Sequence, residues 1–433
     1  MTDVLRIAPE LGAAENDRFH RFKLIGWWDQ QRLRRARILV VGAGALGNEI
    51  VKNLALLGVG QVLIADMDRI ENSNLSRSVL YRGSDNGQLK ATAAAAAARG
   101  IYPDIKAHAF NGNVVHDLGL GVFRWADVVI AGLDNREARL SINRNCWKVN
   151  RPWIDGAIEA IDGSARVFVP DNNADDAPCY ECTMSATDWK LLQMRRSCNL
   201  LSRPEMEGGK TPTTPTVSSI VAGVQCQEAV KLLHGMQTLA GGAWVFSGVT
   251  ADSYITRFQR KDDCYSHDTL DEVVALDDGV ATITSRQLLA LARQHLGDER
   301  ATIELAREVL EKLVCPRCGG EERLFASLGK VPAAKAWCPA CRAAGREDVR
   351  RDVVTFYKLR GDEDFLDRPL GEIGVPPFDV VIARSGDGTR SVGFELAGDA
   401  TAVLGDLAGV SLSSAATGRG NDVDDDDDEL ELA

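Results

Sequence analysis

The sequence has no long apolar run and no excess of basic residues. No stretch approaches the roughly 20 apolar residues that cross a bilayer, and the first residues lack the basic start and apolar core of a signal peptide. The 433 residues include 62 acidic and 50 basic side chains, for a formal net charge of −12. A general nucleic-acid or anionic-membrane binder favours the opposite balance. We therefore expect a cytoplasmic protein with no membrane and no nucleic-acid partner.

The cysteines are unevenly placed along the chain. Six of the ten fall in C-x-x-C pairs, and in a reducing compartment such pairs are more often metal ligands than disulfides. With 45% apolar residues, the chain is long enough for a large core and for about two to three domains.

Short apolar stretches alternate with helical patterns over the first 150 residues. This alternation predicts an α/β fold with a doubly wound, mostly parallel, Rossmann-like sheet. The four expected strands are residues 37–42, 61–66, 105–110 and 127–132.

The motif GAGALG follows the first expected strand and places Gly42, Gly44 and Gly47 at the start of a helix. The first glycine permits a tight turn, the second lets backbone approach a phosphate, and the third lets the helix pack on the strand. Asp66 ends the next strand, at the spacing of a carboxylate that binds ribose hydroxyls. Taken alone, this pattern leaves a nicotinamide or flavin oxidoreductase open.

Three further segments indicate which class of nucleotide-binding enzyme the chain resembles. DMDRIENSNLSRSVLY, DNGQLKA and AGLDNREAR occur in this order, and together they resemble the adenylation fold of the ThiF, MoeB and ubiquitin-activating family. The resemblance covers about residues 15–260. It implies an ATP- and magnesium-dependent homodimer that adenylates the C-terminal glycine of a ubiquitin-like or sulfur-carrier protein. A hydride-transfer enzyme has no need of the cations in these segments.

The resemblance also implies roles for single residues. Attack of a carboxylate on the α-phosphate brings two anions together, so the reaction needs cations and magnesium. By resemblance, Asp66 and Asp68 belong to the nucleotide-binding motif, with Asp66 on the ribose, and Asp134 binds magnesium. Arg21 reaches into the nucleotide site of the partner subunit. The residues implied to contact the phosphates are Asn74, Arg77 and Lys90.

Two structural zinc sites are expected. The spacing of CPRCGG and CPAC is typical of a four-cysteine zinc ribbon, which leaves no open coordination position. A third pair, in PCYECT, has a distant partner motif in DDCYSH. Many family members clamp the crossover region with zinc here, so the resemblance implies a site of three cysteines and one histidine. The expected ligands are Cys315, Cys318, Cys338 and Cys341 in the ribbon, and Cys179, Cys182, Cys264 and His267 in the clamp.

One cysteine remains as a candidate nucleophile. Cys146 and Cys226 lie in helical patterns and are expected to be buried. Cys198 lies in a polar stretch that corresponds to the family's crossover loop, which carries the reactive cysteine. Arg195 and Arg196 precede it, and nearby cations favour the thiolate. We expect Cys198 to accept the acyl group as a thioester for a conjugating enzyme, although the Pro-Cys-Thr signature of the large eukaryotic enzymes is missing.

The rest of the chain is expected to form smaller units. From about Thr284, two helical stretches should lead into the ribbon, and a β-rich module of unassigned role should follow. The acidic end, rich in aspartate, is expected to be disordered. The expected units are an adenylation domain over 1–267, a helical segment with the ribbon over 268–350, the β-rich module over 351–410 and the tail over 411–433.

Alternative functions remain open at this point. The nearest keeps the adenylation but passes the acyl group to sulfur, as in thiamine, molybdopterin or thiolation chemistry. A less favoured one is a related enzyme that activates a carboxylate on modified tRNA. A scaffold without catalysis is disfavoured by the complete set of polar residues. The sequence alone does not identify the carrier, and it does not separate a thioester from direct transfer.

Overall fold

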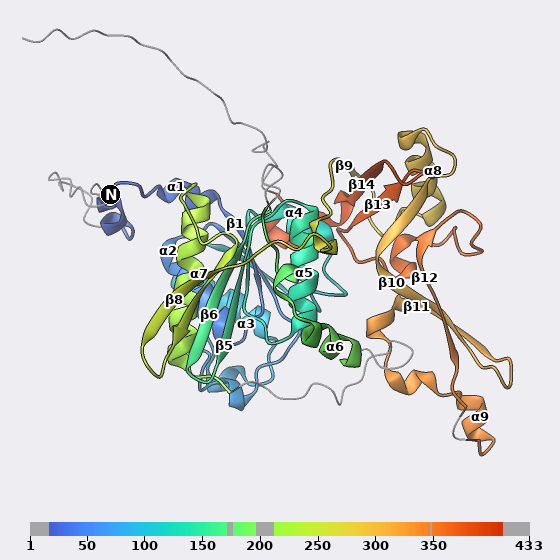
Figure 1. The fold of residues 1–433 in the computed structure, drawn as a ribbon, viewed down its shortest axis with the longest axis horizontal. Helices are drawn as coiled ribbons and strands as arrows, with labels where there is room; N and C mark the ends of the chain where they lie inside the picture. The colour runs from blue at the N-terminus through green and yellow to red at the C-terminus, as the bar shows by residue number, and fades with distance from the viewer. Residues whose placement is uncertain (1–16, 171–175, 196–211, 347–348, 410–433) are drawn as a thin grey trace, which may run out of the picture.

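The computed structural model describes residues 17–170, 176–195, 212–346 and 349–409 (Figure 1). These residues build an eight-stranded sheet and a six-stranded sheet, one in each half of the molecule. No helix within the described ranges is long and apolar enough to span a membrane. The expected acidic tail over 411–433 lies outside them.

The eight-stranded sheet confirms the predicted mostly parallel α/β fold. Its order is β3-β2-β1-β4-β5-β6-β7-β8, with β1 to β5 parallel and the last three strands antiparallel. All four predicted strands are present as β1 to β4, whereas β5 was not predicted. The strands are β1 (Arg37–Val41), β2 (Gln61–Ala65), β3 (Lys106–Phe110), β4 (Val128–Ala131), β5 (Trp153–Glu159), β6 (Asp162–Phe168), β7 (Gly242–Ser247) and β8 (Asp252–Arg257).

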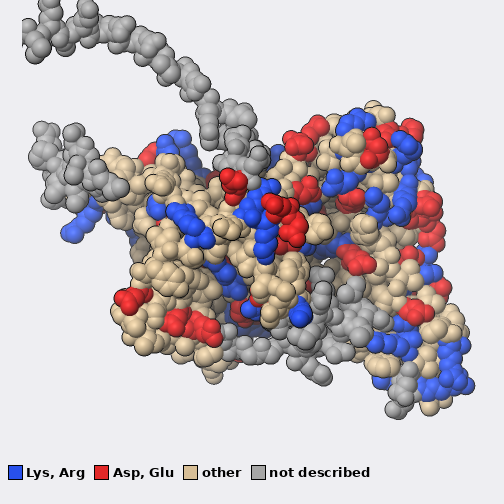
Figure 2. Space-filling model, viewed as in Figure 1, with Lys and Arg blue, Asp and Glu red and all other residues tan. Residues whose placement is uncertain are grey.

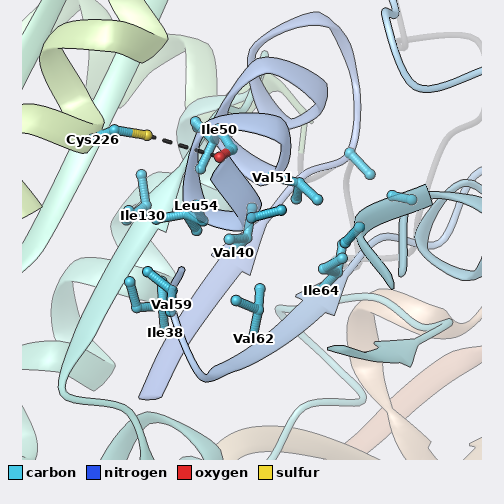
Figure 3. Close-up of a cluster of buried hydrophobic side chains, with 14 of the residues drawn as sticks. Ile38, Val40, Ile50, Val51, Leu54, Val59, Val62, Ile64, Ile130 and Cys226 are labelled. Carbon is cyan, nitrogen blue, oxygen red and sulfur yellow. Dashed lines mark hydrogen bonds between the residues drawn. The ribbon is translucent and has the colours of Figure 1, made fainter. Parts of the chain in front are cut away.

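Both faces of this sheet are covered by apolar helix surfaces. Along β1, Ile38 and Val40 point into one core, and Leu39 and Val41 into the other, because successive strand side chains alternate. Figure 3 shows the first core, where α2 side chains such as Ile50 pack on the strands. The first core is covered by α2 (Ala45–Leu57), α3 (Lys90–Ile101) and α7 (Pro215–Leu233), and the second by α4 (Leu120–Trp125) and α5 (Arg136–Lys148).

The second sheet gathers strands from both sides of residue 350. Its order is β11-β10-β13-β14-β9, and β12 pairs with β10. The expected boundary between 268–350 and 351–410 therefore falls within one sheet. The elements are β9 (Val273–Leu276), α8 (Ser285–Leu296), β10 (Thr302–Val314), β11 (Glu321–Ser327), α9 (Pro339–Ala343), β12 (Asp352–Leu359), β13 (Val380–Arg384), β14 (Ser391–Leu396) and α10 (Ala400–Leu404).

Two helical stretches were expected before the ribbon, and the second of these predictions is wrong. The first is α8, but TIELAREVLEKLV forms the strand β10. Its Glu, Leu, Arg and Lys residues favour a helix locally. However, β10 pairs with β11, β12 and β13, and Ile303, Leu310 and Leu313 are fully buried. Non-local pairing and burial therefore override the local propensity.

The two halves of the molecule share one hydrophobic cluster. Phe378 and Leu404 of the C-terminal half belong to the same buried cluster as Leu120 and Phe123 of α4. The backbone contributes as well, because Gly121 N–H donates to the Phe378 carbonyl at 3.0 Å. The second sheet is thus fixed against the α4 side of the first.

Charged side chains of both signs are interspersed over the face shown in Figure 2. Among the charged residues of the C-terminal half, Arg384 forms ion pairs with Glu304 at 2.5 Å and with Asp268 at 3.4 Å. These side chains are partly exposed, and ion pairs within reach of solvent each contribute little to stability.

Candidate active site

The glycine-rich turn lies at the carboxyl edge of the first sheet, between β1 and α2. Gly42 has a φ of +92°, and a Cβ there would lie 2.6 Å from the Gly132 carbonyl oxygen. A Cβ on Gly47 would lie 1.8 Å from the Gly42 carbonyl oxygen. Gly44 differs, because a Cβ there would meet no heavy atom within 4 Å. The turn therefore has open space at the N-terminus of α2, where backbone N–H groups favour an anion.

Asp66 follows β2 and contacts this turn directly. One carboxylate oxygen accepts a hydrogen bond from Ala43 N–H at 2.7 Å, and the other accepts one from Asp68 N–H at 2.8 Å. Burial raises the pKa of Asp66, while these two hydrogen bonds and the charge of Lys90 oppose the rise. A further hydrogen bond from a ligand hydroxyl would stabilise the charged form.

Lys90 lies beside these carboxylates at the first residue of α3. Its ammonium group is 2.8 Å from an Asp68 carboxylate oxygen, and only 12% of its side chain is exposed. The structure therefore brings Asp66, Asp68 and Lys90 together, as the sequence predicts. An anionic ligand would compete with Asp68 for the Lys90 ammonium group.

Asn74 and Arg77 lie in the segment between β2 and α3. Asn74 is buried, and its side-chain oxygen accepts a hydrogen bond from Glu71 N–H at 3.0 Å. The Arg77 guanidinium donates to the Ser73 carbonyl at 2.8 Å. Both side chains are thus held by their own segment, and within the described residues neither forms a hydrogen bond with the glycine-rich turn.

Asp134 lies at the same sheet edge, in the turn between β4 and α5. The edge is continuous because β4 pairs with β1, and Gly132 N–H donates to the Val41 carbonyl at 3.0 Å. Asp134 itself is exposed. The next residue, Asn135, caps α5 by accepting a hydrogen bond from Ala138 N–H at 2.7 Å. An exposed carboxylate on a fixed turn can ligate a hard cation such as magnesium.

Two residues that hold the glycine-rich turn were not predicted. The Asn48 amide donates to the carbonyls of Ala43 at 2.8 Å and Gly44 at 3.0 Å, and accepts from Leu80 N–H at 2.9 Å. The Tyr81 hydroxyl also donates to the Ala43 carbonyl, at 2.7 Å, and burial raises its pKa. The available signals were the position of Asn48 one helical turn after Gly44 and the tyrosine that ends SNLSRSVLY.

Arg21 does not lie with the other predicted residues. It is exposed in the short helix η1 (His20–Leu24). The adjacent Phe19 faces Gly58, the C-cap of α2. Because α2 begins at the carboxyl edge of the sheet, its C-cap lies toward the opposite edge. Arg21 is therefore placed away from the carboxyl edge of the first sheet in its own chain.

Cys179, Cys182, Cys264 and His267 form one compact cluster. The sulfur of Cys179 lies 3.7 Å from that of Cys182 and 3.5 Å from that of Cys264, and the Cys182 sulfur lies 3.5 Å from His267 Nε2. Four ligands around zinc, with Zn–S bonds of about 2.3 Å, are separated by similar distances. Burial lowers the pKa of His267, which favours the neutral ring that binds a metal. The cluster could therefore hold zinc.

The second cluster lies at the end of the β10–β11 hairpin, beside α9. The sulfur of Cys315 is 3.8 Å from that of Cys341, and the sulfur of Cys318 is 3.7 Å from that of Cys338. These spacings are equally suited to a tetrahedral metal ion. All eight expected ligands thus fall into the two predicted groups.

The remaining thiols differ in their surroundings. Cys146 and Cys226 are buried, and burial raises the pKa of Cys226 to about 12 and that of Cys146 well above its usual value. Cys198 lies outside the described residues. The described ends of its segment are attached near the carboxyl edge of the first sheet, because Asp188 of α6 (Ala186–Arg195) pairs with Arg136 at 2.7 Å, and Ala160, the residue after β5, donates its N–H to the Pro212 carbonyl at 2.7 Å.

Comparison with known proteins agrees with this geometry. The ThiF family model matches residues 17–266. The chain is 30% identical to a sulfur carrier protein adenylyltransferase of Thermus thermophilus over 247 residues, which cover 55% of this chain and 85% of that protein. It is 37% identical to a SAMP-activating enzyme E1 of Haloferax volcanii over 179 residues, which cover 40% of this chain and 63% of that protein.

A solved structure of E. coli MccB with ATP is 20% identical, with a TM-score of 0.49, and the match covers 59% of this chain and 75% of that one. The curated relatives are named as adenylyltransferases or activating enzymes. The chain is therefore an enzyme of the adenylyltransferase type and belongs to the ThiF family.

Proposed function

We propose that the enzyme uses ATP and magnesium to adenylate the C-terminal carboxylate of a small sulfur-carrier or ubiquitin-like protein. The main support is the arrangement at the carboxyl edge of the first sheet. There an open helix N-terminus, the Asp66–Asp68–Lys90 group and the exposed Asp134 lie on neighbouring segments. The names of the Thermus and Haloferax relatives support the class of substrate.

The chemistry assigns each group a task. The N–H groups around Gly44 and the Lys90 ammonium bind phosphate oxygens, and Asp66 accepts hydrogen bonds from the ribose hydroxyls. We assign Arg77 and Asn74 to the phosphates as well, with Arg77 adding positive charge. A carboxylate oxygen of the carrier forms a bond to the α-phosphorus, and the bond to the bridging oxygen breaks to release pyrophosphate. Magnesium, held by Asp134, would neutralise charge on the leaving pyrophosphate.

The proposal has two variants, which differ in the acceptor that receives the acyl group from the adenylate. The relative named a sulfur carrier protein adenylyltransferase supports a sulfur carrier as the substrate, with transfer of the acyl group to sulfur, and this is the variant that we favour. The SAMP-activating relative supports activation of a protein modifier. For that variant we propose a thioester on Cys198 and delivery to a conjugating enzyme. The tRNA-directed alternative has no comparable support among these relatives.

We also propose a homodimer with Arg21 acting in the partner's nucleotide site. The support is the placement of η1, whose arginine lies away from the carboxyl edge of the first sheet in its own chain and is exposed to solvent. A cation supplied across a dimer interface would add to the charge stabilisation that this reaction needs.

Nucleotide binding is the direct test of the proposed function. In isothermal titration, ATP with magnesium should bind and NAD should not, because the residues after Asp66 supply cations for a triphosphate. A purified carrier ending in glycine should then stimulate ATP–pyrophosphate exchange. Tight binding of NAD without binding of ATP would refute adenylation and return the chain to the oxidoreductases.

Metal content tests the two cysteine clusters. Elemental analysis of the purified enzyme should find about two zinc ions per chain, since each cluster has four ligands at tetrahedral spacing. Cys315→Ser should lower the content by about one ion, and the matched control Cys146→Ala should retain two. If the Cys315→Ser variant keeps the full content, the ribbon does not bind zinc.

A further inference from the structure

A fully buried carboxylate lies one strand away from the candidate magnesium residue, and the mechanism above does not use it. Asp155 on β5 has no exposed side-chain area. One of its oxygens is 2.8 Å from Nε of Arg139, and the other pairs with the Arg166 guanidinium. A buried carboxylate is costly unless it is paired, so the two arginines account for its charge.

Arg139 connects this carboxylate to the turn that carries Asp134. Its terminal Nη2 donates to the Leu133 carbonyl and, at 3.0 Å, to the Gly156 carbonyl. Leu133 directly precedes Asp134, and Asn135 on the other side caps α5. The residues on both sides of Asp134 are therefore fixed. Leu133 is bound by the Arg139 guanidinium, and Asn135 caps α5.

The charges around Arg139 also connect Asp155 with Asp134. Burial is the largest single effect on Arg139 and would lower its pKa, but the charge of Asp155, the hydrogen bond to it, and the smaller contributions of Tyr180 and Asp134 together raise this pKa. Without the Asp155 charge, the buried guanidinium would turn more strongly toward the nearby Asp134 carboxylate. That interaction would compete with magnesium for the same oxygens.

A second link extends from Asp155 toward the cysteine–histidine cluster. The Arg166 guanidinium lies over the Tyr180 ring at 5.3 Å, and Tyr180 follows the cluster residue Cys179. The Tyr180 backbone N–H donates to the Asn143 side chain on α5 at 2.9 Å. The cluster, α5 and the Asp134 turn are thus fixed to one another around Asp155.

We propose that Asp155 is a positioning residue, which fixes Arg139 so that the Leu133–Asp134 turn presents the Asp134 carboxylate to magnesium. This inference rests on the proposed function. It differs from a purely structural role in one respect: loss of the Asp155 charge should weaken the contribution of magnesium to ATP binding, and not only the stability of the fold.

The chain offers a matched control at the opposite edge of the sheet. Asp127 precedes β4 and pairs with Arg37 of β1 at 2.6 Å, and it also accepts a hydrogen bond from Arg37 N–H at 2.9 Å. Asp127→Asn therefore removes a carboxylate from an Asp–Arg pair of the same sheet. It does so at the amino ends of β1 and β4, away from Asp134.

The experiment measures ATP affinity by isothermal titration with and without magnesium. The ratio of the two dissociation constants is the coupling between magnesium and ATP. Asp155→Asn should lower this ratio by at least about fivefold, the lower end of typical coupling between sites, while the affinity without magnesium changes little. Asp127→Asn should lower the melting temperature and leave the ratio within about twofold of the unmodified enzyme.

The outcomes distinguish a positioning role of Asp155 from a purely structural role. A destabilised Asp155→Asn variant with an unchanged ratio would overturn the positioning role and leave the proposed function intact. If this variant does not fold, Arg139→Lys decides, because it keeps the charge but loses the fork that joins Asp155 to Leu133. The same fall in the ratio would support the proposal, and no fall would reject it. Failure of the unmodified enzyme to bind ATP would reject both.

Discussion

Replacing Asp134 with alanine should reduce carrier-stimulated ATP–pyrophosphate exchange by about 100-fold or more, the scale of losing one electrostatic group that acts on the transition state. Asp134 is exposed and lies in a turn rather than in a core, so the fold should survive. Its removal would leave charge on the leaving pyrophosphate without a fixed magnesium ligand. Exchange assays across a range of magnesium concentrations measure the loss.

The control for this variant is Asp104→Ala. Asp104 is also exposed, and it lies just before β3 at the amino edge of the sheet. It should leave exchange and the melting temperature nearly unchanged. If Asp134→Ala retains full exchange at limiting magnesium, the assignment of the metal ligand is wrong and the carboxylates at Asp66 and Asp68 become the better candidates.

Replacing Cys198 with alanine should separate two half-reactions. Adenylation requires only the nucleotide site, so pyrophosphate exchange should persist. The thiol-sensitive adduct between enzyme and carrier should disappear completely from a denaturing gel, since no thiol would remain to form the thioester. Cys146→Ala is the control and should keep the adduct, because burial holds the pKa of the Cys146 thiol well above its usual value.

The choice of Cys198 rests partly on the other nine cysteines. Seven lie in the two metal-type clusters, and Cys146 and Cys226 are buried. If exchange and adduct both survive in Cys198→Ala, the acyl group leaves the adenylate directly or through another nucleophile. An adduct that resists thiols but yields to hydroxylamine would be an oxyester, and a hydroxyl such as Ser197 or Thr211 would then replace the cysteine.

Local patterns were sufficient to predict the strands β1 to β4 of the first sheet. The strands β1 to β4 are short and apolar, with glycines or helical patterns between them, so their type and parallel pairing follow from the chain itself. The glycine spacing and Asp66 predicted the turn and the carboxylate beside it, and the structure has the two in contact. The C-x-x-C spacing predicted the four-cysteine group, and the family resemblance implied the cysteine–histidine group; the structure brings the side chains of each group together.

The rest depended on contacts between distant segments. β5 contains Gly156, which disfavours a strand locally, yet it pairs with β4 and β6. β10 has a helical composition, and only its pairing with three other strands makes it extended. The contacts of Tyr81 with Ala43 and of Asp155 with Arg139 are equally non-local, because the sequence does not place these partners beside one another.

The hydrophobic cluster shared by the two halves has an evolutionary consequence. Phe378, Leu404 and Leu407 bury their side chains against the same cluster as α4 of the adenylation fold, and each such side chain is worth about 1.5–3 kcal/mol when buried. Loss of the C-terminal half would therefore favour polar residues at positions such as Leu120 and Phe123 of α4, and gain of this half would favour apolar residues there. The two halves are therefore not independent modules, because a C-terminal half joined to another adenylation fold would need matching apolar residues on α4.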